Sequence, residues 1–446
     1  MSSRIDLSDV IQREATELWG DGKGPLLATI AGAWGILLGT RMIYPVLLPY
    51  LRSSFDLSLT AGGLLVTVLW LGSALGQLPG GIIADRYNER SVLIAGTLVV
   101  AGALALVVTA PTPFVLFAAT ALVGVGQSLY PIARITMLSK IYPDRIGSAL
   151  GVTMATGDLG QTVLPPIGGA LAAAVAWQVG LGFIAPLLLF AAVALWVILP
   201  EPTSIAPDSA SDSSPERSTE PSAEPSTEPS AERSTEPSAE PSAEPSTTGS
   251  LSVENARSVI SDLRDANLTF VAFILFLYIL IWQSFTGLYP TYLVEVKGLS
   301  SSLAGLLFSA FFAFGVVIKP VAGAAYDQIG IRKSLLIVLV GPVVGLAALP
   351  LIEGFWPLAA ITALVSTMLG SGAITQSFLS DAIPAEIQGT GLGVVRTTTA
   401  TLGAAGPVLF GAIADRGYFD EGYVLLAAVL AVVILLTLRL PEGSRA

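Results

Sequence analysis

Five ionisable side chains stand inside long apolar stretches of this 446-residue sequence. They are Arg41, Arg134, Asp158, Lys319 and Arg396. A charge in the middle of an apolar, membrane-spanning helix costs roughly 3 kcal/mol, so it normally faces a wet cavity or an ionic partner. These five residues are therefore the first candidates for binding a charged solute or moving a proton.

Arg41 lies within GILLGTRMIYPVLLPYL, residues 35–51, far from both ends of the apolar run. At that depth its side chain cannot easily extend to either surface. A guanidinium can bind a carboxylate or a phosphate through two parallel hydrogen bonds. The sequence predicts that Arg41 faces a central cavity and binds substrate; the alternative is a structural pair with Asp158 or with a helix end.

Lys319 is a second cation at depth, and together with Arg41 it indicates an anionic substrate. The alternative for Lys319 is that its ammonium group extends to the nearby surface. We expect these cavity neighbours: Tyr44, Gln77, Trp282 and Gln283.

Asp158 is the one carboxylate that the sequence places deep in a helix, which makes it a candidate proton carrier. The alternative is a static ion pair with Arg134. Arg396 lies two turns inside its helix, where we expect a contact with the loop around Asp85 rather than with substrate.

The composition is that of a membrane protein. Hydrophobic residues make up 53% of the chain and charged residues only 12%, against roughly a quarter charged in soluble proteins. Cysteine and histidine are both absent from the sequence, which excludes disulfides, thiolate metal sites and Ser-His-Asp or Cys-His catalysis. We expect neither an enzyme nor a cofactor or metal, and without a basic patch we expect no nucleic-acid partner.

Apolar runs predict an all-α membrane protein with twelve spanning helices. Six precede a polar segment, at 27–51, 60–84, 91–109, 113–137, 147–173 and 179–199, and six follow it, at 267–290, 302–326, 333–352, 355–379, 389–414 and 420–440. The predicted organisation is an N-terminal segment (1–26), a six-helix bundle (27–199), a linker (200–265), a second bundle (266–440) and a tail (441–446).

The linker is rich in Pro, Ser and Glu and holds most of the net charge of -11. Because it has almost nothing to bury, we predict a disordered tether over 200–250, followed by a short amphipathic helix over 251–265. Lys and Arg are concentrated in the termini, the linker and the loops on the same side, which predicts cytoplasmic N- and C-termini.

The two bundles are repeats of one another. An offset of 242 residues aligns Gly81 with Gly323 and Asp85 with Asp327, and the same offset aligns Pro165 with Pro407. Parallel repeats of this kind are related by an axis along the membrane normal, and they place a substrate site between them near the midplane.

Two loop segments carry the clearest motif, GGIIADRYNERS (80–91) and GAAYDQIGIRKS (323–334). Both resemble the G-x-x-x-D-R-x-G-R-[RK] signature of the major facilitator superfamily, although the first has Asn88 where glycine is usual. The resemblance implies secondary transport by alternating access, with the signature locking one gate. The gating residues that the resemblance implies are Gly81, Asp85, Arg86, Arg90, Gly323, Asp327 and Arg332. We group Arg396 with them because of its expected contact with the loop around Asp85.

Three further segments resemble branches of that superfamily. The spacing from Arg41 to PYL (49–51) is similar to the organophosphate/phosphate antiporters, and KPVAGAAYDQIG (319–330) is similar to the carboxylate and nitrate carriers. GDLGQTVLPPIGG (157–169) resembles a signature of exporters and antiporters, with Leu164 in place of a glycine.

The sequence therefore predicts a plasma-membrane transporter, functional as a monomer, that moves a small organic anion with or without protons across the lipid bilayer. The alternative within the superfamily is proton-driven export of drugs or hydrophobic compounds. An intramembrane aspartyl protease, suggested by Tyr326-Asp327 and Gly157-Asp158, is disfavoured because the order of its motifs is reversed.

Overall fold

The computed structural model describes residues 18–77, 88–200, 266–382 and 388–440, and every regular element in these ranges is helical. The first half of the chain contains α2 (Gly24–Phe55), α3 (Leu59–Leu75), α5 (Glu89–Val108), α6 (Pro113–Ser128), α7 (Tyr130–Ile141), α8 (Ile146–Ala174), α9 (Trp177–Gly182) and α10 (Ile184–Ile198). The second half contains α12 (Ala266–Glu295), α13 (Ser301–Ala348), α14 (Phe355–Ser366), α15 (Leu369–Ala382), α16 (Gln388–Gly403), α17 (Gly406–Ala414) and α18 (Phe419–Thr437).

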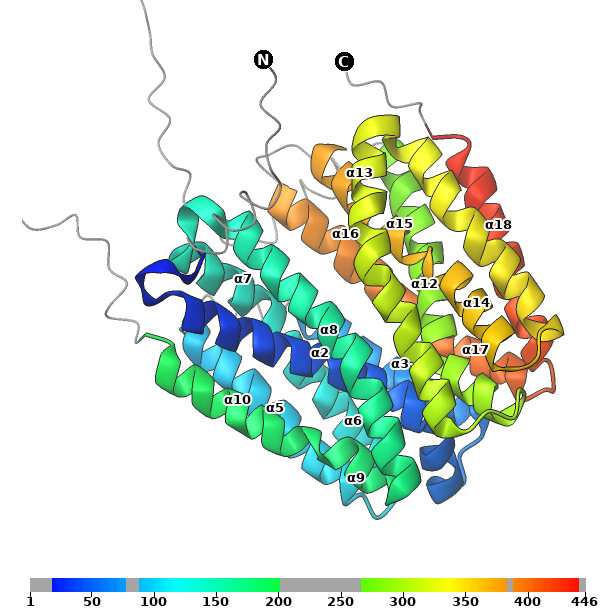
Figure 1. Cartoon of the computed structure of the whole chain (residues 1–446), viewed down its shortest axis with the longest axis horizontal. Coiled ribbons are helices and arrows are strands. Elements are labelled where there is room, and N and C mark those ends of the chain that lie inside the picture. The colour runs from blue at the N-terminus through cyan, green and yellow to red at the C-terminus, as the bar shows by residue number, and fades with distance from the viewer. Residues whose placement is uncertain (1–17, 78–87, 201–265, 383–387, 441–446) are drawn as a thin grey trace, which may run out of the picture.

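The two halves form two helical bundles that lie side by side (Figure 1). Helices α2, α3 and α8 of the first half pack against α12, α13 and α17 of the second along a common seam. In Figure 1, α8 and α13 are adjacent at the lower end of the seam and diverge toward its upper end. We call the lower end, which holds residues 52–60, 295–301 and 415–420, the closed end.

Several predicted spans are divided where proline or glycine interrupts the helix. Pro131 is the second residue of α7 and Pro407 the second residue of α17, positions that suit proline because its missing amide hydrogen is not needed in the first turn. Gly330 divides α13 with φ 75° and ψ 174°, a conformation open essentially to glycine. Asn88, at the equivalent position of the first repeat, has φ -58° and caps α5 instead, so the two copies of the loop signature differ at this turn.

Nine stretches of the described residues are long and apolar enough to cross a membrane. One of them, Ser301–Leu351, contains the two predicted spans that meet at Gly330. Helix α3 is described over 17 residues and is apolar but shorter. The count of twelve spans and the cytoplasmic position of the termini remain predictions.

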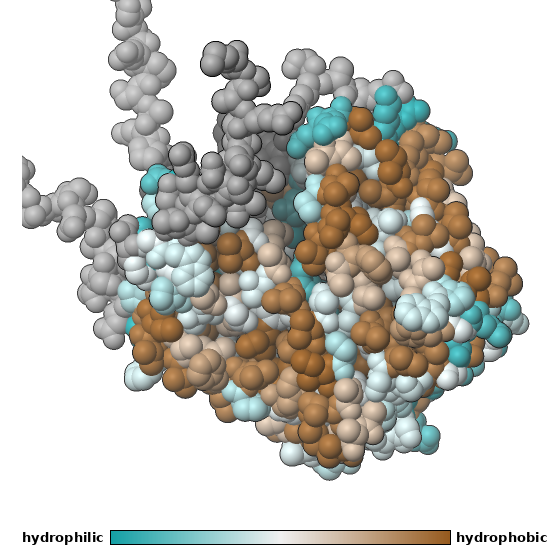
Figure 2. All heavy atoms as spheres, in the orientation of Figure 1, coloured by the Kyte–Doolittle hydropathy of each residue, from teal (hydrophilic) through white to brown (hydrophobic). Residues whose placement is uncertain are grey.

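The outer surface carries many large apolar side chains, as a bilayer-embedded protein requires. Phe190, Trp196 and Val317 are all well exposed, and Figure 2 shows hydrophobic residues over both bundles. Inside each bundle the large side chains are packed and buried. The predicted linker (200–265) and the segments 1–17 and 441–446 lie outside the described residues, apart from Pro200.

Candidate functional site

Arg41 lies in the middle of α2 and is held by three neighbours from its own half. Its Nε donates to Gln127 Oε1 at 2.9 Å, and its Nη2 donates to Ser73 Oγ at 2.6 Å. The guanidinium also stacks over the Trp70 ring, 4.6 Å from the ring centre. Gln127 is itself fixed by a bond from Nε2 to the Leu37 carbonyl at 3.0 Å. The side chain is thus pre-positioned by an ordered network.

All of these partners are electrically neutral. Within the described ranges no carboxylate forms an ion pair with Arg41, and its Nη1 has no hydrogen-bond partner. A guanidinium that is held but not neutralised attracts an anion, because its desolvation is otherwise uncompensated. The alternative pairing of Arg41 with Asp158 is not formed, since Asp158 pairs with Lys319.

Trp70 links the Arg41 network to the other half of the molecule. Its ring meets Trp282 of α12 edge to face, with ring centres 5.1 Å apart. The Trp282 Nε1 and the neighbouring Gln283 Oε1 are buried without hydrogen-bond partners in this structure. Gln283 occupies the position equivalent to Arg41 in the second repeat, so the repeat does not duplicate the guanidinium.

Gln77 and Tyr44, the other two expected cavity neighbours, form no hydrogen bond with Arg41 among the described residues. Gln77 is half-buried and donates to the Ser73 carbonyl one turn earlier in the chain, at 3.2 Å. Tyr44 is 1% exposed, and its hydroxyl belongs to the packed core of the first half. The Tyr44 hydroxyl is buried without a hydrogen-bond partner among the described residues, and its role beside the solute stays a prediction.

Asp158 and Lys319 form an ion pair between the two halves. Lys319 Nζ of α13 lies 2.6 Å from Asp158 Oδ1 of α8, and Gln161 Nε2 donates to the same oxygen at 3.2 Å. The side chain of Asp158 is 17% exposed and that of Lys319 is 35% exposed, so the pair is partly accessible to water. The alternative of Lys319 extending alone to the surface is wrong in this structure.

Arg134 does not pair with Asp158, contrary to the static-pair alternative. Its Nη1 donates to Thr153 Oγ1 at 2.6 Å, and its guanidinium stacks over the Trp34 ring at 4.3 Å. The Arg134 side chain is buried, and its Nε has no partner. This arrangement holds Arg134 inside the first half, between α7, α8 and α2.

The predicted gating residues are only partly described. Gly81, Asp85 and Arg86 lie outside the described residues, so the expected contact between Asp85 and Arg396 is untested. Arg90 donates to the Trp196 carbonyl within its own half. Gly323, Asp327 and Arg332 flank the turn at Gly330 in α13, and Arg396 is an exposed residue of α16.

Sequence reasoning missed the neutral partners of Arg41 and a set of polar contacts at the closed end. Gln127 and Ser73 carry no charge, so nothing marked them as part of a site. Arg52, Glu295 and Asp415 stand at helix ends, where charges are ordinary, and only their positions across the seam give them significance.

The family model described as Major Facilitator Superfamily matches residues 29–407 and 271–446. The uncharacterised transporter YgaY of Escherichia coli K12 is 28% identical over 180 residues, and the match spans 40% of this chain and 45% of the length of that protein.

Two further relatives have named solutes. The hexuronate transporter of Bacillus subtilis strain 168 is 25% identical over 413 residues, or 88% of each chain. The enterobactin exporter EntS of Salmonella paratyphi A is 33% identical over 128 residues, or 27% of this chain and 31% of the exporter.

Among solved structures, the chain resembles a bacterial homologue of the human lysosomal transporter Spinster in an inward-facing, occupied conformation. The TM-score is 0.70 at 14% sequence identity, over 95% of this chain and 99% of the other. At that identity the likeness shows a shared fold.

Proposed function

The chain belongs to the Major Facilitator Superfamily, whose members transport small solutes, and within that family we propose that it carries a small organic anion across the membrane by alternating access. The observation that carries this proposal is the state of Arg41. Its guanidinium is ordered by Gln127, Ser73 and Trp70 but has no carboxylate partner among the described residues. A carboxylate on the solute would supply the missing counter-charge through a forked pair of hydrogen bonds.

The aromatic pair beside Arg41 favours an anion with an apolar or sugar-like body. Trp70 and Trp282 come from opposite halves and meet at the level of the guanidinium. Such a ring pair offers flat surfaces to the body of a solute while Arg41 binds its charged group. A hexuronate, the solute named for the Bacillus subtilis relative, has both a carboxylate and a sugar ring.

The ion pair between Asp158 and Lys319 suggests how protons could be coupled to that transport. While Asp158 is ionised it neutralises Lys319 at 2.6 Å. A proton on Asp158 would remove that attraction and leave Lys319 able to bind the anion. Proton and anion would then be taken up together, which is symport.

Transport into proteoliposomes tests the proposal. Purified protein would be reconstituted and offered radiolabelled glucuronate, galacturonate and a panel of other carboxylates, with an imposed pH gradient and with the gradient collapsed. We expect saturable uptake of at least one carboxylate that increases when the outside is acidic. Saturable uptake of neutral sugars only, with no carboxylate competing, would reject the anion proposal.

The second candidate is export of hydrophobic compounds. It is favoured by the exporter-like signature over residues 157–169 and by the match to EntS, which covers a limited part of both chains. The two candidates differ in what competes for binding. Displacement of a bound fluorescent hydrophobic cation by other cations, and not by carboxylates, would favour the exporter.

A further inference from the structure

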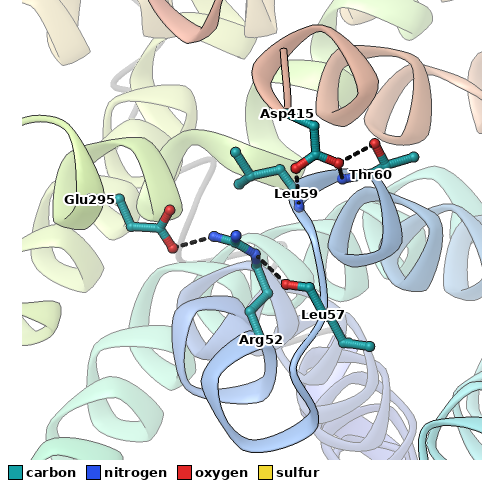
Figure 3. Close-up of polar contacts among 6 residues, drawn as sticks. All are labelled: Arg52, Leu57, Leu59, Thr60, Glu295 and Asp415. Carbon is teal, nitrogen blue, oxygen red and sulfur yellow. Dashed lines mark hydrogen bonds and ion pairs between the residues drawn. The ribbon is translucent and has the colours of Figure 1, made fainter. Parts of the chain in front are cut away.

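The carboxylate of Asp415, in the second half, caps the N-terminus of helix α3 in the first half. Asp415 follows the last residue of α17, and its Oδ1 and Oδ2 accept hydrogen bonds from the backbone amides of Leu59 and Thr60, each at 2.7 Å. The Thr60 hydroxyl donates to the same carboxylate. Figure 3 shows these contacts converging on Asp415 from the start of α3.

This arrangement completes the capping of α3. The first four amides of a helix have no partner within the helix. Ser58 Oγ accepts from the Ala61 amide at 3.2 Å, and the Gly62 amide makes the first regular helical bond, to the Ser58 carbonyl at 2.9 Å. Asp415 satisfies the Leu59 and Thr60 amides and places a negative charge at the positive end of the helix dipole. Separation of the halves here would leave these two amides to water.

A second charged contact crosses the seam nearby. Arg52, at the end of α2, pairs with Glu295, at the end of α12, and its Nε donates to the Leu57 carbonyl at 3.2 Å. Figure 3 shows this pair beside the Asp415 contacts. Both contacts join the first half to the second at the closed end.

The backbones of α3 and α17 are closely packed next to the Asp415 contacts. A Cβ atom added to Gly63 would overlap the Pro407 carbonyl oxygen, and one added to Gly411 would overlap the Leu59 carbonyl oxygen. Only glycine allows α3 and α17 to approach this far. The polar contacts at Asp415 therefore lie on a tightly fitted surface.

The repeat shows that this capping is not symmetric. The offset of 242 places Ala173 at the position of Asp415, and Ser301 and Ser302 at the positions of Leu59 and Thr60. At that equivalent contact α13 is capped by its own Ser300, whose Oγ accepts from the Leu303 amide at 3.4 Å. A carboxylate from the opposite half is thus present at the α3–α17 contact and replaced by alanine at the α8–α13 contact.

We propose that Asp415 and the Arg52–Glu295 pair form a one-sided latch that holds the closed end of the seam shut. The α3–α17 side must release charged hydrogen bonds before the end can open. At this end Gly169 of α8 packs against Ser301 of α13, no carboxylate joins the two helices there among the described residues, and this side can act as the hinge. The latch sets the balance between the two conformations whether or not substrate is present, so it does not depend on the identity of the solute.

The absence of cysteine from the sequence makes a direct distance measurement simple. Spin labels would be placed on Ser54→Cys and Glu421→Cys, two exposed positions on opposite sides of the closed end, and their separation measured by pulsed electron resonance in nanodiscs. In the unmodified background we expect one dominant short distance. Asp415→Asn removes the charge, and we expect the ratio of open to closed molecules to rise about tenfold, as for loss of a charge-assisted hydrogen bond.

Asp56→Asn is the matched control. Asp56 is an exposed carboxylate at the same end, in the left-handed conformation that asparagine also tolerates, and it forms no ion pair across the seam with any described residue. We expect its distance distribution to equal that of the unmodified background. The double variant Asp415→Ala with Glu295→Gln should open further than either single change.

Folding of each variant would be checked by gel filtration and thermal melting. A folded double variant that keeps the unmodified short distance would overturn the latch. Equal opening in Asp56→Asn and Asp415→Asn would also overturn it, since the effect would then come from general charge at this end.

Discussion

Lys319 Nζ and Asp158 Oδ1 lie 2.6 Å apart although they belong to different halves of the molecule. A contact of this kind has to change whenever the halves move relative to each other at that level. Both side chains are partly exposed, so the pair contributes little to the free energy of unfolding. Its significance is that the carboxylate neutralises the positive charge of Lys319. While the pair is intact, Lys319 is a poor partner for a second anion.

Replacing Asp158 by Asn should separate binding from coupling. Lys319 would lose its counter-ion at every pH, so the anion could bind without a proton. We expect accumulation driven by a pH gradient to fall about tenfold or more, while exchange of labelled for unlabelled anion across the membrane stays within about threefold of normal. Both rates would be measured in the same proteoliposomes.

The Asp56→Asn variant serves as the control for neutralising a carboxylate elsewhere. Normal pH-driven accumulation by Asp158→Asn would remove Asp158 from the coupling mechanism. Loss of both driven accumulation and exchange would instead indicate that the ion pair is needed for the movement itself.

Arg41 should be sensitive even to the change to lysine. Lysine keeps the charge but cannot bond both Gln127 and Ser73 and still present two parallel donors to a carboxylate. We expect Arg41→Lys and Arg41→Gln to weaken anion binding about 10-fold to 100-fold, the range for losing hydrogen bonds to a charged group. Binding would be measured by calorimetry on detergent-purified protein.

Arg439→Gln is a matched control, because it removes one exposed guanidinium just after the end of α18. It should bind the anion normally. If Arg41→Gln bound the same carboxylate as tightly as the Arg439→Gln control, Arg41 would be structural and the proposed anion site would be rejected.

The sequence alone predicted the broad fold because membrane spans leave a strong local signal. Long apolar runs located nearly all of the helices, and Pro131 and Gly330 divide them for reasons that are visible locally. The constant offset of 242 residues predicts two repeated halves. Each of these features depends on residues that are close in the chain or that repeat.

The contacts across the seam could not be predicted in the same way. Asp158 and Lys319 were both identified as unusual charges. They are 161 positions apart in the sequence, and their pairing depends on how their two helices are rotated about their axes. Asp415 binds backbone amides, which every residue except proline possesses. The sequence therefore contains no side-chain pattern from which its partners could be predicted. Whether Tyr44 lines the solute path likewise depends on helix rotation, because an aromatic hydroxyl near Arg41 in sequence can point to either side of α2.

Close packing inside the first half gives a prediction about stability. Gly160 of α8 lies so near α2 that an added Cβ would overlap the Gly35 carbonyl oxygen. We expect Gly160→Ala to destabilise the protein by about 1–3 kcal/mol through overpacking. Gly102→Ala is the control, because that site has open space around it and should change the melting temperature little. Equal melting temperatures for the two variants would contradict the close approach of α2 and α8.

The latch at Asp415 should persist in acid. Burial alone raises the pKa of this carboxyl, but hydrogen bonds from Thr60, Ser58 and Leu59 outweigh burial and lower the pKa below the usual 3.8. A group whose pKa is lowered by its contacts stabilises them fully above its ordinary pKa and loses that contribution only as the pH falls through the lowered value. We therefore expect the Ser54→Cys and Glu421→Cys spin-label distance to stay unchanged between about pH 8 and pH 5. Opening of the closed end within that interval, in protein that carries Asp158→Asn to remove the other proposed titrating group, would show that Asp415 is protonated too easily to be held by these bonds.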